Sequence, residues 1–134
     1  MSVINLTQHT ATADQAAAGV FNLPEAVRQE LSTLLTFDDV SDATATEIAA
    51  RAGRIALIAA LHASPDDRDD DNGFADAAMI GGAPWLMRPL ADALICQGIR
   101  PVFAFSKRET VEAPDGNGGV RKTAVFKHAG FVPA

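Results

Sequence analysis

Residues 76-DAAMIGGA-83 form an apolar run without polar alternation, and Pro84 follows them directly. Such a run is typical of a strand that is buried on both faces, as in the centre of a parallel sheet. Proline suits the first position of a helix, so we predict a helix over residues 84–98. Gly81 and Gly82 stand at the corner between strand and helix, where they permit a sharp turn or a close approach to the backbone.

The remaining segments alternate in the same way. Residues 3–8, 20–23, 101–109 and 121–132 are expected as strands, and residues 12–18, 24–35 and 44–63 as helices. Alternating strands and helices favour a parallel sheet with helices on both faces, whereas the turn signal 115-DGNGG-119 makes the last two strands antiparallel neighbours. We therefore predict one α/β domain over residues 1–134, a small three-layer Rossmann-like sandwich with a mostly parallel sheet and an antiparallel C-terminal hairpin.

Local signals refine the helices. Thr10 or Thr12 is suited to cap the start of the first helix. Pro24 is suited to the first position of the second helix. The second helix has one apolar face, formed by Val27, Leu31, Leu34 and Leu35. In the long helix 44–63, Leu57, Ile58 and Leu61 widen the apolar stripe, so we expect it to be covered on more than one side. Pro89 kinks the last helix or marks where its regular part begins, and Gly98 suits its end.

The net charge of −6 argues against an extended basic face and therefore against duplex nucleic acid as a partner. A local basic patch for a small anion is still compatible with the sequence, because basic residues gather near the C-terminus. They are Lys107, Arg108, Arg121, Lys122 and Lys127. No apolar stretch has the length of a membrane helix, and the N-terminal residues lack the layout of a signal peptide. The single Cys96, which we expect to pack within its helix, cannot form an internal disulfide, so the predicted location is the cytoplasm.

Three predicted loops should meet in one crevice, because ligands of open α/β sheets bind at the carboxyl ends of the parallel strands. These loops supply the candidate ligand-binding and catalytic residues. They are Thr7, Gln8, His9 and Thr10 after the first strand, Gly81, Gly82 and Trp85 after the middle strand, and Ser106, Lys107 and Arg108 on the next.

The residue types in these loops suit a phosphate-bearing ligand such as a nucleotide. Glycines allow close approach, and the start of the following helix offers free N–H groups and partial positive charge. Lys107 and Arg108 add full charges, and Trp85 is able to stack on a base.

Each residue also has a purely structural interpretation. The glycines would permit close packing of the helix on its strand, and Trp85 would anchor a core or an interface. His9 would be a polar residue satisfied by a loop carbonyl rather than a proton shuttle. Lys107 and Arg108 would keep an edge strand soluble and unpaired.

Other motifs are incomplete. Asp67, Asp69 and Asp71 resemble the start of a calcium loop, but Asn72 replaces the glycine and Ala78 the bidentate glutamate, which favours a solvated acidic loop. The histidines lack metal-ligand spacing, and the corner GGAP is not the GxGxxG fingerprint. We therefore expect neither a metal site nor a dinucleotide cofactor.

The opening segment 4-INLTQHTATADQ-15 resembles that of small CRISPR-associated proteins related to the CARF group (CRISPR-associated Rossmann fold). In those proteins an apolar strand ends in a short Ser/Thr-and-His stretch, and a Thr and a Gln lead into a helix. The matching positions are Thr7, His9, Thr12 and Gln15.

This resemblance implies a homodimer that binds a cyclic oligoadenylate across its two-fold axis, with metal-independent cleavage, as in ring nucleases, as a further expectation. The ribose 2′-OH would then be the internal nucleophile, so the protein would align it and stabilise developing charge. His9 or Lys107 would assist proton movement or stabilise the phosphate, Ser106 and Arg108 would hold it, and the two glycines would let it approach. A dedicated general base is missing, so binding without turnover stays open.

Two other classes of function remain open. One is a non-enzymatic interaction module whose apolar helices, 44–63 and 84–98, form a dimer or contact a larger partner. The other is a small phosphotransfer or phosphoesterase enzyme that acts on a monomeric nucleotide with a metal ion.

Overall fold

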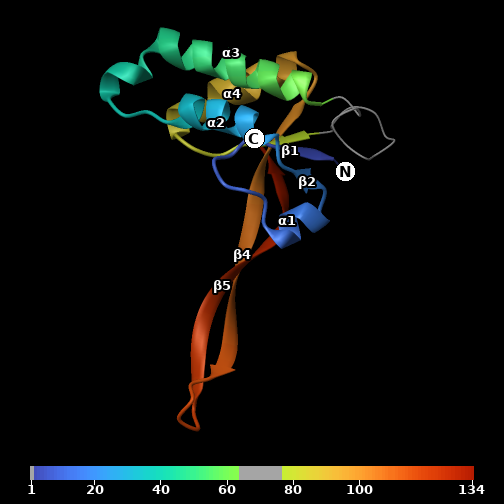
Figure 1. Cartoon of the computed structure of the whole chain (residues 1–134), viewed down its shortest axis with the longest axis vertical. Helices are drawn as coiled ribbons and strands as arrows, with labels where there is room; N and C mark the ends of the chain where they lie inside the picture. Colours follow the sequence, from blue (N-terminus) through green and yellow to red (C-terminus); the bar gives the residue numbers. More distant parts are fainter. Residues whose placement is uncertain (1, 64–76) are drawn as a thin grey trace.

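The computed structural model describes residues 2–63 and 77–134, which contain a five-stranded sheet of order β2-β1-β3-β4-β5 (Figure 1). Its strands are β1 (Val3–Asn5), β2 (Val20–Phe21), β3 (Ala77–Met79), β4 (Arg100–Pro114) and β5 (Val120–Pro133). Strands β2, β1, β3 and β4 run parallel to one another, and β5 pairs antiparallel with β4. The predicted α/β class, with a mostly parallel sheet and an antiparallel C-terminal hairpin, is confirmed.

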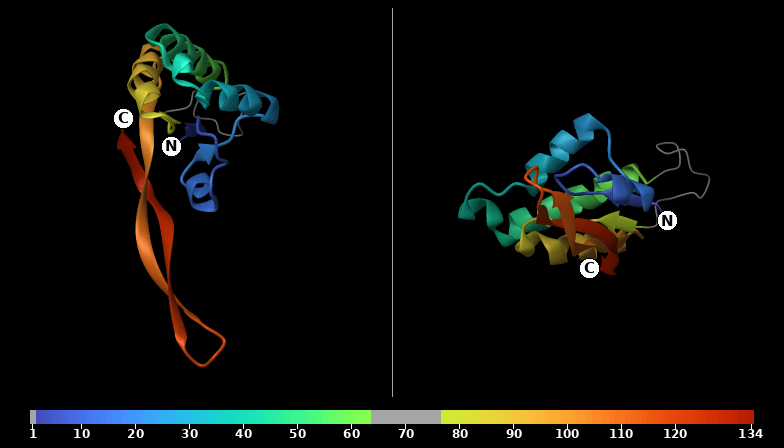
Figure 2. Two further views of the ribbon diagram at one scale, coloured as in Figure 1. Left: turned by 90° about the vertical axis from the view of Figure 1, so that its left-hand side faces the viewer. Right: turned by 90° about the horizontal axis from the view of Figure 1, so that it is seen from below.

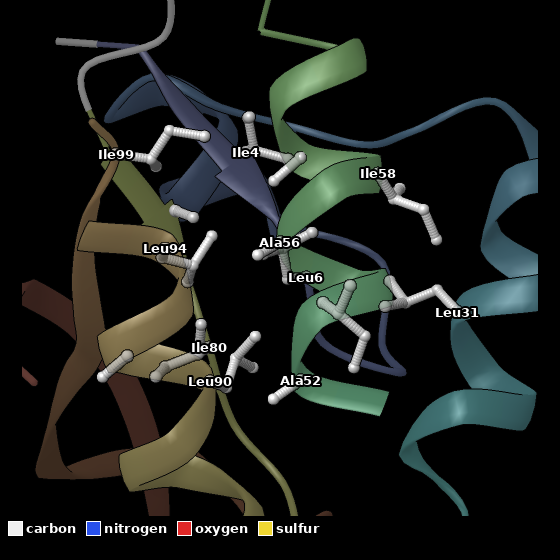
Figure 3. Close-up of a cluster of buried hydrophobic side chains, with 14 of the residues drawn as sticks. Ile4, Leu6, Leu31, Ala52, Ala56, Ile58, Ile80, Leu90, Leu94 and Ile99 are labelled. Atoms are coloured by element: carbon white, nitrogen blue, oxygen red, sulfur yellow. The ribbon is translucent and has the colours of Figure 1, made fainter. Parts of the chain in front are cut away.

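The helices are α1 (Ala13–Ala17), α2 (Glu25–Leu35), α3 (Ala45–Leu61) and α4 (Pro84–Cys96), with a short 3-10 turn η1 (Val40–Ala43) before α3. Helices α2, α3 and α4 supply the large core on one face of the sheet (Figure 3). The core cluster of the other face contains no residue of these three helices, whereas α1 contacts β2 and β5. Right-handed connections explain the division, because β2 and β4 lie on opposite sides of the β1–β3 pair.

The central strands are buried on both faces, as the apolar run 76–83 predicts. In β3, Ala78 belongs to the large helical core, and Ala77 and Met79 belong to the opposite cluster. Val3 and Ile4 of β1 alternate in the same way, and both are fully buried. The sheet is therefore held by two separate apolar clusters.

The helix ends follow local chemistry. Thr12 accepts from the N–H of Gln15 while the Gln15 side chain accepts from the N–H of Thr12, a reciprocal cap of α1. Pro84 is the first residue of α4, as predicted, but Pro24 lies one position before the first residue of α2. Helix α4 continues through Pro89, and Gly98 closes it with a φ of 76°.

Two expectations about burial are wrong. Leu57 and Leu61 of α3 are 41% and 61% exposed, because the sheet, α2 and α4 cover only the face that contains Ile55 and Ile58. Cys96 is exposed at the end of α4 rather than packed within the helix. The apolar face of α2 is confirmed, since Leu31 and Leu35 are buried and Val27 and Leu34 are partly buried.

The C-terminal hairpin is much longer than predicted and extends far beyond the rest of the sheet (Figures 1 and 2). Strand β4 was expected to end near Glu109, but pairing with β5 continues to Pro114 opposite Val120. A register shift interrupts the ladder between Phe105 and Ser106. We call residues 106–128, the part beyond this irregularity, the arm.

Candidate functional site

An open pocket of about 560 Å³ lies at the carboxyl ends of β1 and β3, beside β4. The chain goes from β1 to β2 on one side of β1 and then to β3 on its other side, so the pocket lies at the point where the strand order reverses. This is the usual ligand position in open α/β folds. Its volume lies within the range of small-molecule sites. The lining residues are Thr7, Gln8, His9, Thr10, Thr12, Gln15, Met79, Ile80, Gly81, Gly82, Phe103 and Ala104.

Asn5 organises the loop that forms one wall. This residue is 4% exposed, and its Nδ2 donates to the carbonyl oxygen of His9 at 2.7 Å and to Oδ1 of Asn22 at 2.9 Å. Its Oδ1 accepts from the backbone N–H and the hydroxyl of Thr7. Asn22 also accepts from the N–H of Ala11. The two asparagines therefore replace, for this loop, the backbone ladder of β1, which continues only as far as the bond from the N–H of Leu6 to the carbonyl oxygen of Met79.

Neither asparagine belongs to a recognisable motif, but the sequence contains one signal for Asn5. Asn5 interrupts the apolar segment 3-VINL-6 at a position where β1 is buried. A buried amide needs several hydrogen-bond partners, so an Asn at this point predicts a loop folded back onto its own strand.

Further contacts fix the remaining lining. Gln8 Nε2 donates to Oγ1 of Thr36, just beyond the end of α2, at 3.0 Å. Thr12 and Gln15 are held by their reciprocal cap, which leaves the Gln15 amide nitrogen without an acceptor in the described part of the chain. The polar rim thus consists of neutral side chains, most of them anchored at one end.

The glycine corner closes the floor of the pocket, and its two residues differ. Gly82 has a φ of 137°, a conformation that residues with a Cβ rarely adopt, so glycine is required there by the turn itself. Gly81 has ordinary backbone angles, and a Cβ at this position would meet Cγ2 of Thr7 at 3.5 Å, an ordinary contact. No described residue accepts a hydrogen bond from the N–H of either glycine. These amides and the start of α4 make the floor suitable for an anion.

His9 supplies the only imidazole that lines the pocket, and its side chain is exposed. Its backbone carbonyl accepts from Asn5, so the position of the residue is fixed while the ring stays accessible. Among residues 2–63 and 77–134, the lining contains no Lys, Arg, Asp or Glu side chain. The described lining therefore brings no fixed charge to this site.

Ser106, Lys107 and Arg108 do not line the pocket; they follow it on β4. Lys107 is three residues past Ala104, about 10 Å further along a strand. Arg108 lies opposite Phe126, and Lys107 opposite Lys127, whose Nζ is 3.6 Å from Oε2 of Glu109. The predicted basic groups therefore stand on the root of the arm rather than in the crevice.

Trp85 also lies outside the lining. Its ring meets that of Phe37 edge-on at 5.5 Å and remains 49% exposed. The guanidinium of Arg51 lies 4.3 Å from the centre of the Phe37 ring and donates to the carbonyl oxygens of Leu34 and Thr36. This cluster joins α4 to the end of α2, which favours the anchoring interpretation of Trp85.

Among residues 2–63 and 77–134 we find no group of acidic, His or Cys side chains arranged to hold a metal ion. The calcium-like run Asp67, Asp69 and Asp71 lies outside the described residues. Within the same described ranges, no helix is long and apolar enough to cross a membrane.

The fold and the pocket define an α/β protein with a neutral polar crevice at the carboxyl edge of its parallel strands. A family model, that of the Uncharacterized protein MJ1673 family, matches residues 1–132, so the chain belongs to the MJ1673 family. No curated protein and no solved structure gives a significant match to it.

Proposed function

We propose that this protein binds a phosphate-bearing nucleotide in the pocket at the carboxyl ends of β1 and β3. The observation that carries the proposal is the pair of amides at Gly81 and Gly82, which line the pocket and have no acceptor among the described residues. They adjoin the start of α4, where the helix dipole favours negative charge. A phosphate oxygen would satisfy these donors.

The rest of the lining suits the other parts of a nucleotide. Hydroxyl and amide groups of Thr10 and Gln15 suit the ribose and the phosphate oxygens, and Thr7 and Gln8 hold the loop that presents them. Met79, Ile80 and Phe103 add apolar surface for a base. A few oriented polar groups on an otherwise apolar surface are the usual composition of a small-molecule site.

The position of Lys107 and Arg108 favours a ligand with more than one phosphate. A mononucleotide on the glycine corner would end near Ala104, about 10 Å short of Lys107 along the strand. A cyclic oligoadenylate is large enough to occupy the pocket and extend to the root of the arm, where these two side chains and Ser106 would contact it. The resemblance of residues 4–15 to CARF-related proteins leads to the same ligand, bound by a homodimer.

Cleavage of such a ligand would need few protein groups. The ribose 2′-OH attacks the adjacent phosphorus, the new O2′–P bond forms as the P–O5′ bond breaks, and the products are a 2′,3′-cyclic phosphate and a 5′-hydroxyl. His9 is the side chain able to accept or supply the proton in this step. The amides of Gly81 and Gly82 would stabilise the charge on the phosphate.

Thermal melting with added ligands tests the binding proposal. Cyclic tri-, tetra- and hexaadenylate, AMP and inorganic phosphate are titrated separately, and a ligand at 100 times its dissociation constant should add about 2.7 kcal/mol to the free energy of unfolding. We expect a cyclic oligoadenylate to raise the melting temperature more than AMP does. If none of these compounds changes melting, nucleotide binding is refuted.

Two double variants test the basic residues. Lys107→Ala with Arg108→Ala should weaken binding of the cyclic ligand at least tenfold. Arg121→Ala with Lys122→Ala removes the same charge from the far end of the arm and should leave binding nearly unchanged. Equal losses would mean that net charge, not contact, is responsible. Product analysis with His9→Ala and with a chelator separates binding from turnover and metal-independent from metal-dependent cleavage.

The second candidate is a non-enzymatic interaction module. It is favoured by the large apolar side chains that α3 and α4 expose, among them Leu57, Leu61 and Ile95. Absence of any nucleotide effect on melting would leave this candidate in place.

A further inference from the structure

The arm is a long two-stranded ribbon with no core of its own. All ten residues 105–114 of β4 are exposed, and in the opposite strand of the arm only Val125 and His128 are partly buried. The left view of Figure 2 shows the described helices gathered at one end of the molecule and the ribbon extending beyond them. An isolated two-stranded hairpin is marginally stable in water at best. A ribbon of this length is therefore expected to pack on something else.

The arm exposes apolar side chains that such packing would cover. Phe126 is 75% exposed and Val120 63%. Phe126 and Val120 lie on one face, because paired residues of antiparallel strands share a face and these two are six residues apart on the same strand. A charged, soluble edge strand does not require a phenylalanine at a position that is 75% exposed, so this face has the composition of a contact surface.

Charge indicates what the arm packs on. The arm carries five basic and three acidic side chains, a net charge of +2. The rest of the chain carries −8, of which −5 comes from residues 64–76, outside the described part, and −3 from the described body. The face that exposes Phe126 and Val120 also carries two basic side chains. Arg108 is the direct cross-strand partner of Phe126, and Lys122 lies opposite Glu112 on the same face. An acidic surface packed on this face would pair with Arg108, whereas Lys107 and Lys127 lie on the opposite face.

We propose that the arm packs on the acidic body of a second copy of this chain, so that two copies exchange arms about a two-fold axis. Nucleic acid is disfavoured as the occupant, because the body that would accompany the arm is strongly negative. A second copy supplies the complementary charge in the same molecule, and a two-fold axis lets each arm cover the other body.

The area is sufficient. Ten residues of strand span about 34 Å, and two paired strands are about 10 Å wide, so each arm covers about 340 Å² in projection. Two arms and the two surfaces beneath them bury about 1,400 Å² in total, within the range of stable protein interfaces. The register irregularity at Phe105/Ser106 and Gly130, with a φ of 145°, place a bend where the arm leaves its own sheet. The inference does not rest on nucleotide binding.

Light scattering and sedimentation of the ligand-free protein test the exchange. The wild type should have twice the mass of one chain at micromolar concentration, and Phe126→Asp should raise the dimer dissociation constant at least tenfold. Leu61→Asp places the same charge on a similarly exposed apolar position of α3 and should leave the dimer unchanged. Val120→Asp provides an independent arm variant, and circular dichroism and melting verify that each variant is folded.

Charge variants provide a second readout. Arg108→Gln with Lys122→Gln removes the basic groups from the Phe126 face and should weaken the dimer and reduce its salt dependence. Arg54→Gln with Arg88→Gln removes two exposed basic groups from the body and should not. The proposal is overturned if the wild type is monomeric up to about 100 μM, if Phe126→Asp and Leu61→Asp behave alike, or if the monomer binds duplex DNA through the arm. Because no nucleotide is present, these outcomes are independent of the melting titrations.

Discussion

The amide nitrogen of Asn5 lies 2.7 Å from the carbonyl oxygen of His9, and this contact joins the buried end of β1 to the rim of the pocket. The buried side chain of Asn5, at the end of a core strand, therefore holds the rim of the candidate site in place. A change at Asn5 should therefore affect both stability and the shape of the pocket.

Asn5→Ala tests this coupling. The substitution leaves the N–H of Thr7 without its acceptor and removes the shorter of the two hydrogen bonds to the carbonyl of His9, which keeps only the Thr7 hydroxyl at 3.1 Å. Such losses each cost about 1–3 kcal/mol when the groups stay buried. We expect urea unfolding to show a loss of about 2–4 kcal/mol. Asn117→Ala in the exposed hairpin turn serves as the control and should change the free energy of unfolding by less than about 0.5 kcal/mol. Equal effects at the two positions would refute the role given to Asn5.

Alanine substitutions at the two residues of the glycine corner should separate stability from ligand binding. Gly82→Ala forces a Cβ into a φ of 137° and should cost more than about 1 kcal/mol in the free energy of unfolding. Gly81→Ala meets only Cγ2 of Thr7 at 3.5 Å and should leave stability within about 0.5 kcal/mol of the wild type. The Gly81 variant should nevertheless weaken any ligand bound at the corner, because its methyl group lies in the pocket. Thermal melting with and without ligand measures both effects.

The sequence predicted the order and type of the elements because their signals are local. Apolar periodicity predicted α2, and Pro84 predicted the start of α4. The glycine-rich turn predicted the antiparallel hairpin of β4 and β5. Six of the candidate residues, in the loop after β1 and at the glycine corner, do line one pocket, because the carboxyl ends of parallel strands meet at one edge.

What the sequence did not predict depends on contacts remote in the chain. The arm continues past Glu109 because each strand pairs with the other, although neither has a buried face that would produce an apolar alternation. Lys107 and Arg108 were therefore expected in a crevice that β4 has already left. Leu57 and Leu61 read as core positions, but whether a wide apolar stripe is covered depends on how many elements reach it.

Arg51 and Arg54 both lie on α3, but their substitution should destabilise the protein to different extents. Arg51 donates to the carbonyl oxygens of Leu34 and Thr36 and lies on the ring of Phe37, with its side chain only 13% exposed. Arg51→Ala should therefore cost about 1–3 kcal/mol in the free energy of unfolding. Arg54 forms a solvent-exposed pair with Glu30, which water and salt screen, so Arg54→Ala should destabilise the protein much less than Arg51→Ala does. Unfolding curves that rank the two variants in the reverse order would contradict the anchoring role of Arg51.

Asp115 makes the end of the arm sensitive to pH. Its carboxylate accepts from the backbone N–H groups of Asn117 and Gly119, and these hydrogen bonds lower the pKa of Asp115 below its usual value near 3.8. A carboxyl group with a lowered pKa stabilises the folded turn above the pKa of the unfolded chain, and this contribution is lost as the pH falls through the lower, folded value. We expect the amide resonances of Asn117 and Gly119 to stay constant from pH 7 to about 5 and to shift together below about pH 4. Asp115→Asn keeps an acceptor oxygen but does not titrate, so its amide resonances should stay constant throughout; a wild-type profile that matches this variant would show that the carboxylate does not hold the turn.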